Sequence, residues 1–216
     1  HGVPVYLFVG RMMWYKGIRI ILDALAKLCQ QKQDFRMIFI GDGDDRIDIE
    51  AYAGKCGIKN KCIFTGAIHD RENLRAWYSR SDLFLFPSTY DTNGLVVREA
   101  AACSLASVLI RGSCAAEGVH DGRNGFLVEE NADSMATCLS SLNIVKMHSI
   151  GEAASRELYI SWADAVKQAS DQYKTVIDRY KHGYYPLRRK PTEAFMKVNV
   201  ELMDALAVLP SLRRHS

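Results

Sequence analysis

Short apolar runs recur along the chain and alternate with stretches whose apolar residues have helical spacing. The apolar runs are at residues 3–9, 36–40, 62–65, 83–86, 107–110 and 126–128, and the helical stretches between them are at 16–31, 46–55, 71–79 and 95–103. Runs this short suit strands that are buried on both faces, and a helix between successive strands is typical of a parallel sheet. The sequence therefore predicts an α/β fold, a Rossmann-like doubly wound parallel sheet with helices on both faces.

The last part of the chain is predicted to be helical. Residues 133–142, 150–159 and 162–180 carry apolar stripes, and after a linker that ends at Pro191 we expect Thr192 to cap a final helix. This pattern predicts a domain over residues 1–182 with a helical C-terminal extension, in which 183–216 form a linker and a last helix.

Composition excludes several classes of protein. The chain is 48% hydrophobic and 25% charged with a net charge of +3, which is typical of an ordinary soluble globular protein and gives no sign of a nucleic-acid partner. Its 6 cysteines include no C-x-x-C pair, so we expect reduced core thiols in a cytoplasmic protein. No long apolar run or signal peptide is visible. The basic residues after position 181 leave peripheral contact with the inner face of a membrane as an alternative to a merely solvated tail.

The segment from strand 83–86 through helix 95–103 carries two carboxylates, Asp91 and Glu99, on either side of the helix start. Ser88 and Thr89 are able to cap that helix, and Gly94 allows backbone to approach a ligand. Ligands of open α/β sheets bind at the carboxyl ends of the strands, and free helix amides favour a phosphate. The alternative is that Asp91 is a loop or capping residue and Glu99 a solvated one.

Two cations follow the first strand in the segment GRMMWYKG. Arg11 stands directly after the strand and Lys16 at the start of the next helix. Both can reach one site at the strand end, and a diphosphate requires such charge. Two surface charges without a ligand would be the simpler interpretation if the carboxylate segment were absent.

The segment F-P-S-x-x-D-x-N-G-L-x-x-x-E-A, residues 86–100, resembles the signature of retaining GT-B glycosyltransferases of family 4. The G-R…K-G residues, the F-x-G-x-I loop at 64–68 and the D-G-x-N-G segment at 121–125 extend the resemblance over roughly residues 3–180. The chain departs from the family where Asp91 replaces the usual Glu and Asn93 the usual Phe.

The resemblance implies roles for particular residues. Asp91 would contact sugar hydroxyls and Glu99 the ribose, while Arg11 and Lys16 would bind the diphosphate and stabilise the leaving group. The expected catalytic residues are Arg11, Lys16 and Glu99, and the expected donor-binding residues are Gly10, Gly41, Gly43, Ile68, Asp91, Asn93, Gly94, Leu95 and Glu99. Neither a metal nor a cofactor is expected. The Asp42-x-Asp44 pair is a weak metal motif, because so short a pattern arises easily by chance.

The resemblance also implies a function. This chain would be the C-terminal, donor-binding half of an enzyme that transfers a hexose with retention from a nucleotide-diphosphate sugar to a sugar or lipid acceptor. A UDP-sugar is favoured, with a GDP-sugar as the alternative. The N-terminal domain would lie outside this chain, residues 183–216 would pack on it, and the 216 residues alone would be inactive. A non-catalytic nucleotide-sugar binding module and, less readily, a structural interaction domain remain as alternatives.

Overall fold

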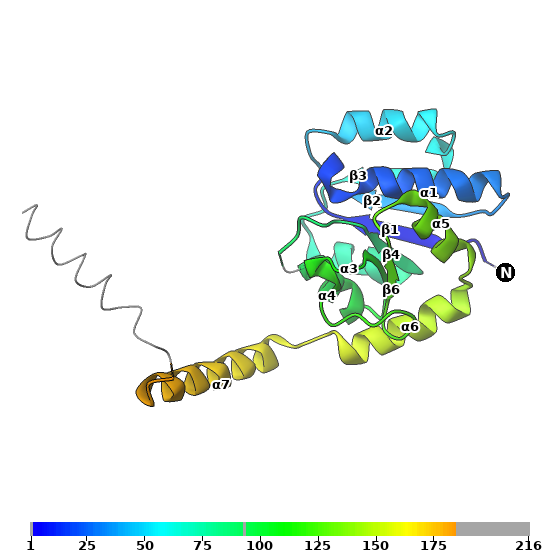
Figure 1. Cartoon of the computed structure of the whole chain (residues 1–216). Coiled ribbons are helices and arrows are strands. Elements are labelled where there is room, and N and C mark those ends of the chain that lie inside the picture. Colours follow the sequence, from blue (N-terminus) through cyan, green and yellow to red (C-terminus); the bar gives the residue numbers. More distant parts are fainter. Residues whose placement is uncertain (1, 93, 185–216) are drawn as a thin grey trace, which may run out of the picture. The chain divides into compact units, whose positions relative to one another are not determined.

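A six-stranded parallel sheet forms the centre of the first unit, as Figure 1 shows for the computed structural model of the chain, which describes residues 2–92 and 94–184. In the order β3-β2-β1-β4-β5-β6, the strands are β1 (Val5–Val9), β2 (Arg36–Ile40), β3 (Cys62–Gly66), β4 (Leu83–Phe86), β5 (Ser107–Ile110) and β6 (Phe126–Val128). Every residue of β4 and β5 is buried, as their short apolar runs predict. The expected Rossmann-like fold is confirmed.

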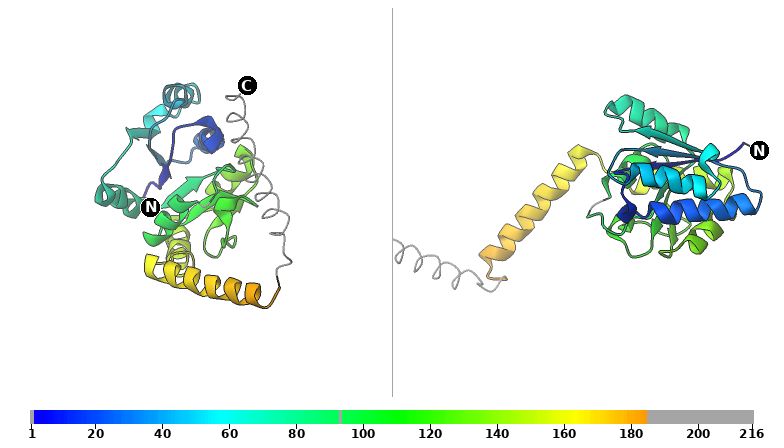
Figure 2. Two further views of the ribbon diagram at one scale, coloured as in Figure 1. Left: turned by 90° about the vertical axis from the view of Figure 1, so that its left-hand side faces the viewer. Right: turned by 90° about the horizontal axis from the view of Figure 1, so that it is seen from above.

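Helices cover both faces of this sheet, as Figure 2 shows. One face carries α1 (Ile18–Gln30), α2 (Arg46–Lys55) and α5 (Ala132–Ser140), and the other carries α3 (Arg71–Arg80), α4 (Leu95–Ala102) and α6 (Ile144–Glu157). Short 3-10 turns are η1 (Trp14–Lys16), η2 (Lys59–Lys61) and η3 (Cys114–Ala116). The chain therefore crosses from one face to the other between β3 and β4, which reverses the direction in which strands are added.

The core lies between the sheet and these two helical layers. The predicted apolar stripe of α1 is buried, at Ile18, Ile21, Leu22, Leu25 and Leu28. On the central strands Phe8 packs against Phe39 and Phe86, with ring centroids 5.9 and 6.0 Å apart. Aromatic residues on three neighbouring strands thus fix the middle of the sheet, from which the loops described below emerge.

The start of one helix and the capping of another differ from the sequence prediction. Helix α6 begins at Ile144 rather than 150, because the Asn143 side chain accepts a hydrogen bond from the Lys146 amide and so caps the helix earlier. Ser88 and Thr89 do not cap α4. Its N-cap residue is Gly94, which lies at φ 54°.

The chain divides into two units, His1–Ile160 and Ser161–Ser216. In the second unit the structure describes α7 (Trp162–Lys181), which the Ser161 side chain caps by accepting from the Asp164 amide. Thr192 and the expected last helix lie outside the described residues, and the division at residue 182 stays a prediction. Among residues 2–92 and 94–184, no helix combines the length and the apolar character needed to cross a membrane.

Candidate functional site

The loops after β1 and β4 leave the sheet where the strand order reverses. Strand β1 pairs with β2 on one side and β4 on the other, and all three strands are parallel, so their carboxyl ends lie at the same edge. The chain leaves β1 toward the layer of α1 and leaves β4 toward the layer of α4 (Figure 1). Doubly wound sheets bind ligands at the point where the loops diverge in this way, and the region between the β1 and β4 loops is called the crevice below.

The loop after β1 is fastened to the loop after β2. The Met12 amide donates to the Asp42 carbonyl at 3.0 Å, and the Trp14 amide donates to Asp45 Oδ2 at 2.8 Å. Gly41 lies at φ 138°, and a Cβ on it would stand 1.9 Å from the Gly10 carbonyl oxygen. The close approach of two backbones thus explains Gly41 and Gly43, whereas a Cβ on Gly10 would meet the Phe8 ring at 3.2 Å; the contact of all three with a donor stays a prediction.

Lys16 is the central cation of the crevice. It is only 7% exposed, and its Nζ atom forms an ion pair with Asp91 Oδ1 at 2.6 Å. The same Nζ atom lies 5.3 Å from the centroid of the Tyr15 ring and 5.9 Å from that of Phe86. Two predicted site residues, one from each loop, therefore form a charge-assisted hydrogen bond.

Close backbone contact holds this pair together. Gly17, at φ 75°, brings the start of α1 against the end of β4, and a Cβ there would stand 2.3 Å from the Pro87 carbonyl oxygen. The second oxygen of Asp91, Oδ2, is buried and has no hydrogen-bond partner within the part of the chain that the structure describes. Asp91 therefore retains acceptor capacity beyond the bond to Lys16.

Arg11 lies at the open side of the same crevice. Its side chain is exposed, and its guanidinium lies 5.6 Å from the centroid of the Tyr15 ring. Tyr15 also meets Tyr90 of the β4 loop edge to face, at 5.9 Å between ring centroids, and Tyr90 is 74% exposed. The sequence analysis missed both tyrosines, although Tyr15 directly precedes Lys16 and Tyr90 directly precedes Asp91.

The N-terminus of α4 offers backbone donors to the crevice. Gly94 has no side chain to cap the helix, and no described residue accepts a hydrogen bond from the amides of Leu95 or Val96. Leu95, a predicted donor-binding residue, is 61% exposed. Asn93, also a predicted donor-binding residue, lies outside the described residues. Free amides at a helix start favour a negatively charged ligand.

Glu99 lies one turn further along α4 and is exposed. Its Oε2 atom accepts a hydrogen bond from the Tyr78 hydroxyl of α3 at 3.0 Å. The Tyr78 side chain is 2% exposed, and burial, followed by the adjacent Glu99 charge, raises the pKa of its hydroxyl well above the ordinary value. Sequence analysis missed Tyr78, because nothing in the spacing of α3 and α4 shows that these two side chains meet.

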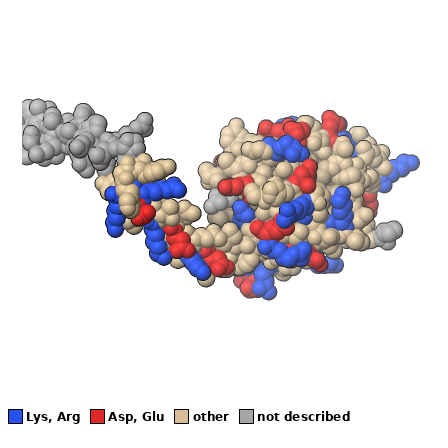
Figure 3. All heavy atoms as spheres, turned by 60° about the horizontal axis from the view of Figure 1, so that its bottom comes forward, with Lys and Arg blue, Asp and Glu red and all other residues tan. Residues whose placement is uncertain are grey.

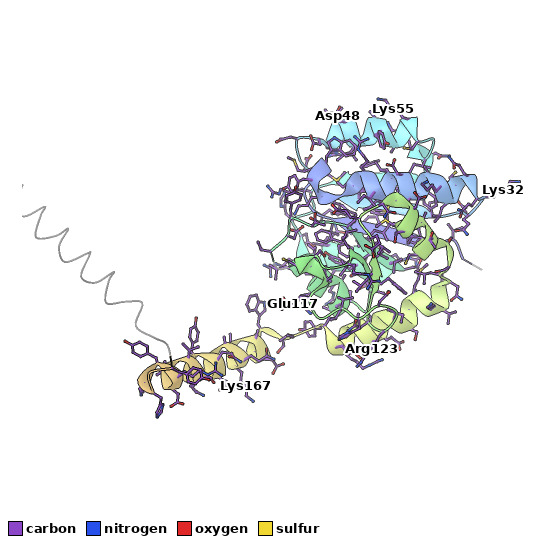
Figure 4. The ribbon with its side chains drawn as sticks, in the orientation of Figure 1. Lys32, Asp48, Lys55, Glu117, Arg123 and Lys167 are labelled. Carbon is purple, nitrogen blue, oxygen red and sulfur yellow. The ribbon has the colours of Figure 1, made fainter. Side chains whose placement is uncertain are left out.

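The other residues that drew attention in the sequence lie apart from this ion pair. Ile68 is half-buried and packs on the core. Glu117, which is labelled in Figure 4 and is not a predicted site residue, accepts a hydrogen bond at its carbonyl from Arg98 Nη2 at 3.2 Å. Asp42 lies 3.7 Å from Arg46 Nη1. Over residues 2–92 and 94–184, no three His, Cys, Asp or Glu side chains are grouped as a metal site would require.

The surface gives two further observations. On the face shown in Figure 3, Lys and Arg are interspersed with Asp and Glu, so that face has no extended patch of one sign. An open hollow between β6 and α5, lined by residues that include Leu127 and Cys138, lies toward the opposite edge of the sheet from β2 and β3. It contains none of the predicted site residues.

Relatives of the chain are glycosyltransferases. An uncharacterized glycosyltransferase of Methanocaldococcus jannaschii is 27% identical over 179 residues, covering 80% of this chain and 45% of the relative. The 2-deoxystreptamine glucosyltransferase of Streptomyces kanamyceticus is 34% identical over 115 residues, covering 52% and 30% respectively. This chain thus spans less than half the length of these curated relatives.

A solved structure with the same fold is that of Anabaena HepE in complex with UDP. It is 25% identical with a TM-score of 0.65, and the match covers 80% of this chain and 49% of that one. The profile of the family described as Glycosyl transferases group 1 matches residues 1–153, most of the chain and all of the sheet. The chain therefore belongs to the glycosyl transferases group 1 family, and its doubly wound Rossmann-like sheet corresponds to one half of a GT-B glycosyltransferase fold.

Proposed function

We propose that this chain is the donor-binding half of a retaining hexosyltransferase, and that the crevice between the β1 and β4 loops binds a nucleotide-diphosphate sugar. The observation that supports the proposal is the Lys16–Asp91 pair at 2.6 Å, because the cation proposed to bind the diphosphate and the carboxylate proposed to bind the sugar lie side by side. The Arg11 guanidinium contacts the ring of Tyr15, the residue before Lys16, and the free amides at the start of α4 follow Asp91 in the chain.

The proposed reaction breaks the bond between the anomeric carbon of the sugar and the terminal phosphate oxygen of the donor. The oxygen of an acceptor hydroxyl forms the new bond to that carbon, the electron pair of the broken bond leaves with the nucleoside diphosphate, and the departing phosphate oxygen takes up the hydroxyl proton. Arg11, Lys16 and the amides of Leu95 and Val96 stabilise the negative charge that develops there, as preorganised donors do in other group transfers. In this proposal no metal is required for that purpose.

UDP is the favoured nucleotide, because HepE of Anabaena was solved with UDP and has the same fold. A hexose is favoured because the 2-deoxystreptamine relative is by name a glucosyltransferase. Asp91 stands where the resemblance leads one to expect Glu, so we propose that its shorter side chain selects among sugars. The acceptor, a sugar or a lipid, and catalysis itself are assigned to the complete enzyme with its N-terminal domain, and the 216-residue chain alone is expected to bind donor without transfer.

Calorimetric titration of the chain with UDP, GDP and ADP tests this proposal. We expect one nucleotide to bind, and Arg11→Met and Glu99→Gln each to weaken binding about tenfold, since each removes a charged hydrogen-bonding group. Both side chains are exposed, so these variants should fold normally. Lys55→Met, at the end of α2 in Figure 4, is the matched control and should bind like the wild type.

Two results would contradict the proposal. If none of the three nucleotides binds, the chain carries no donor site of its own. If a nucleotide binds equally well to the wild type and to both site variants, its site is not the crevice between β1 and β4.

A further inference from the structure

The Glu99 carboxylate has one hydrogen-bond donor within the described residues, and that donor comes from a different helix. Tyr78 of α3 donates its hydroxyl to Glu99 Oε2 at 3.0 Å, and no described group donates to Oε1. An exposed glutamate on a helix surface can occupy several rotamers. A single fixed donor selects those in which Oε2 points toward α3 and Oε1 remains open to the solvent.

The hydroxyl of Tyr78 is itself held firmly. Its ring is 2% exposed and packs against Phe84 of β4, with ring centroids 5.8 Å apart. Helix α3 leads directly into β4, and β4 leads into the loop that carries Asp91, so the tyrosine belongs to the same rigid part of the fold as the crevice. Because burial and the Glu99 charge raise the Tyr78 pKa, the hydroxyl keeps its proton and remains a donor.

We propose that Tyr78 is a positioning residue that makes the site selective for ribose: by holding Oε2 of Glu99, it directs the carboxylate to accept hydrogen bonds from the two ribose hydroxyls of the nucleotide. This inference rests on the proposed function, in which Glu99 contacts the ribose. An ionised carboxylate is an acceptor only and has room for several hydrogen bonds, so the bond from Tyr78 leaves capacity for a diol.

The proposal predicts a specific loss when the hydroxyl alone is removed. Tyr78→Phe retains the buried ring but releases Glu99, so binding should weaken for a nucleotide that has both ribose hydroxyls and not for one that lacks them. A purely structural role for Tyr78 would weaken both nucleotides by the same factor. Tyr6→Phe is a matched control, because Tyr6 is also 2% exposed and no described hydrogen bond joins it to Glu99.

The experiment compares the tightest of UDP, GDP and ADP with its 2′,3′-dideoxy counterpart by calorimetry. We expect the dideoxy nucleotide to bind the wild type about tenfold more weakly. In Tyr78→Phe, affinity for the ribonucleotide should fall about fivefold, with the dideoxy affinity unchanged within about twofold. In a Glu99→Ala background the Tyr78→Phe change should have no further effect, since the two residues act through one interaction.

Several outcomes would overturn the inference. Equal losses for both nucleotides would assign Tyr78 a structural role, and unchanged affinities in Tyr78→Phe would show that Glu99 needs no support. In both cases the wild type still binds nucleotide and the proposed function stands. If the wild type binds none of the three nucleotides, the proposed function fails and this inference fails with it.

Discussion

Replacing Asp91 by Asn removes the negative partner of a nearly buried lysine. Lys16 is 7% exposed as a residue, and the side chain of Asp91 is 22% exposed. After the change, the Lys16 ammonium keeps the rings of Tyr15 and Phe86 near it and has a neutral amide in place of the carboxylate. The structure thus predicts a large effect on folding from a residue that the sequence suggests for ligand binding or, as the alternative, for a loop or helix cap.

The size of this effect follows from the geometry. Two unit charges at 2.6 Å attract by about 6 kcal/mol at an effective dielectric constant of about 20. Loss of the Asp91 charge also removes the desolvation cost of that carboxylate, which offsets several kcal/mol of the attraction, and a hydrogen bond from Lys16 to the Asn amide oxygen retains about 1 kcal/mol after the change. We therefore expect Asp91→Asn to lower the free energy of unfolding by about 2 kcal/mol.

Urea unfolding at neutral pH, arranged as a double-mutant cycle with Lys16→Met, measures this coupling. We expect the double variant to be more stable than the sum of the single changes predicts, by about 2 kcal/mol. Asp133→Asn is the control, because the Lys27–Asp133 pair at 2.8 Å has side chains 40% and 81% exposed and should contribute below about 1 kcal/mol. Additive effects at Lys16 and Asp91, within about 0.5 kcal/mol, would refute the reasoning.

Three further predictions concern stability. Gly41→Ala should lower the free energy of unfolding by roughly 3 kcal/mol or more, because its Cβ would stand 1.9 Å from the Gly10 carbonyl oxygen. Gly57→Ala, at φ 72° with no atom within 4 Å, should lower it by about 1 kcal/mol. Equal urea midpoints for the two variants would contradict this prediction. Burial raises the pKa of the Cys62 thiol to about 12. The protonated thiol therefore contributes fully to the free energy of unfolding below about pH 9, and this contribution is lost as pH rises toward about 12, because the unfolded chain releases the proton first. Cys62→Ala should therefore reduce the alkaline fall of unfolding free energy by up to about 1.4 kcal/mol per pH unit, and an unchanged slope would disprove the assignment. Asn143→Ala should cost about 1 kcal/mol through loss of the α6 cap, and retention of full stability in urea would show that the cap is dispensable.

The sheet and the position of the site were accessible from the sequence because both depend on local patterns. Four-residue apolar runs such as β4, a following proline and an alternating helix are enough to predict a parallel sheet and the end at which ligands bind. The predicted site residues Arg11, Lys16, Asp91 and Glu99 all follow β1 or β4, the two strands at which the order of the sheet reverses.

The pairings within the site were not accessible, because they join residues distant in sequence. Lys16 and Asp91 are 75 positions apart, and Tyr78 and Glu99 are 21 apart on different helices. Which side chains meet depends on how the two loops turn, and Gly17 and Gly94, in left-handed conformations, set those turns. Capping was mispredicted at α4 for the same reason: Ser88 and Thr89 have the right chemistry, but Gly94 occupies the N-cap position.

The most direct test of the proposed donor site is an NMR titration of the isotopically labelled chain with UDP, followed at each backbone amide. The account predicts that the largest shift changes occur at Arg11, Leu95 and Val96, on both sides of the crevice between β1 and β4. Changes concentrated instead at Leu127 and Cys138, in the hollow between β6 and α5, would contradict it, as would saturation with UDP that leaves the β1 and β4 loops unaffected.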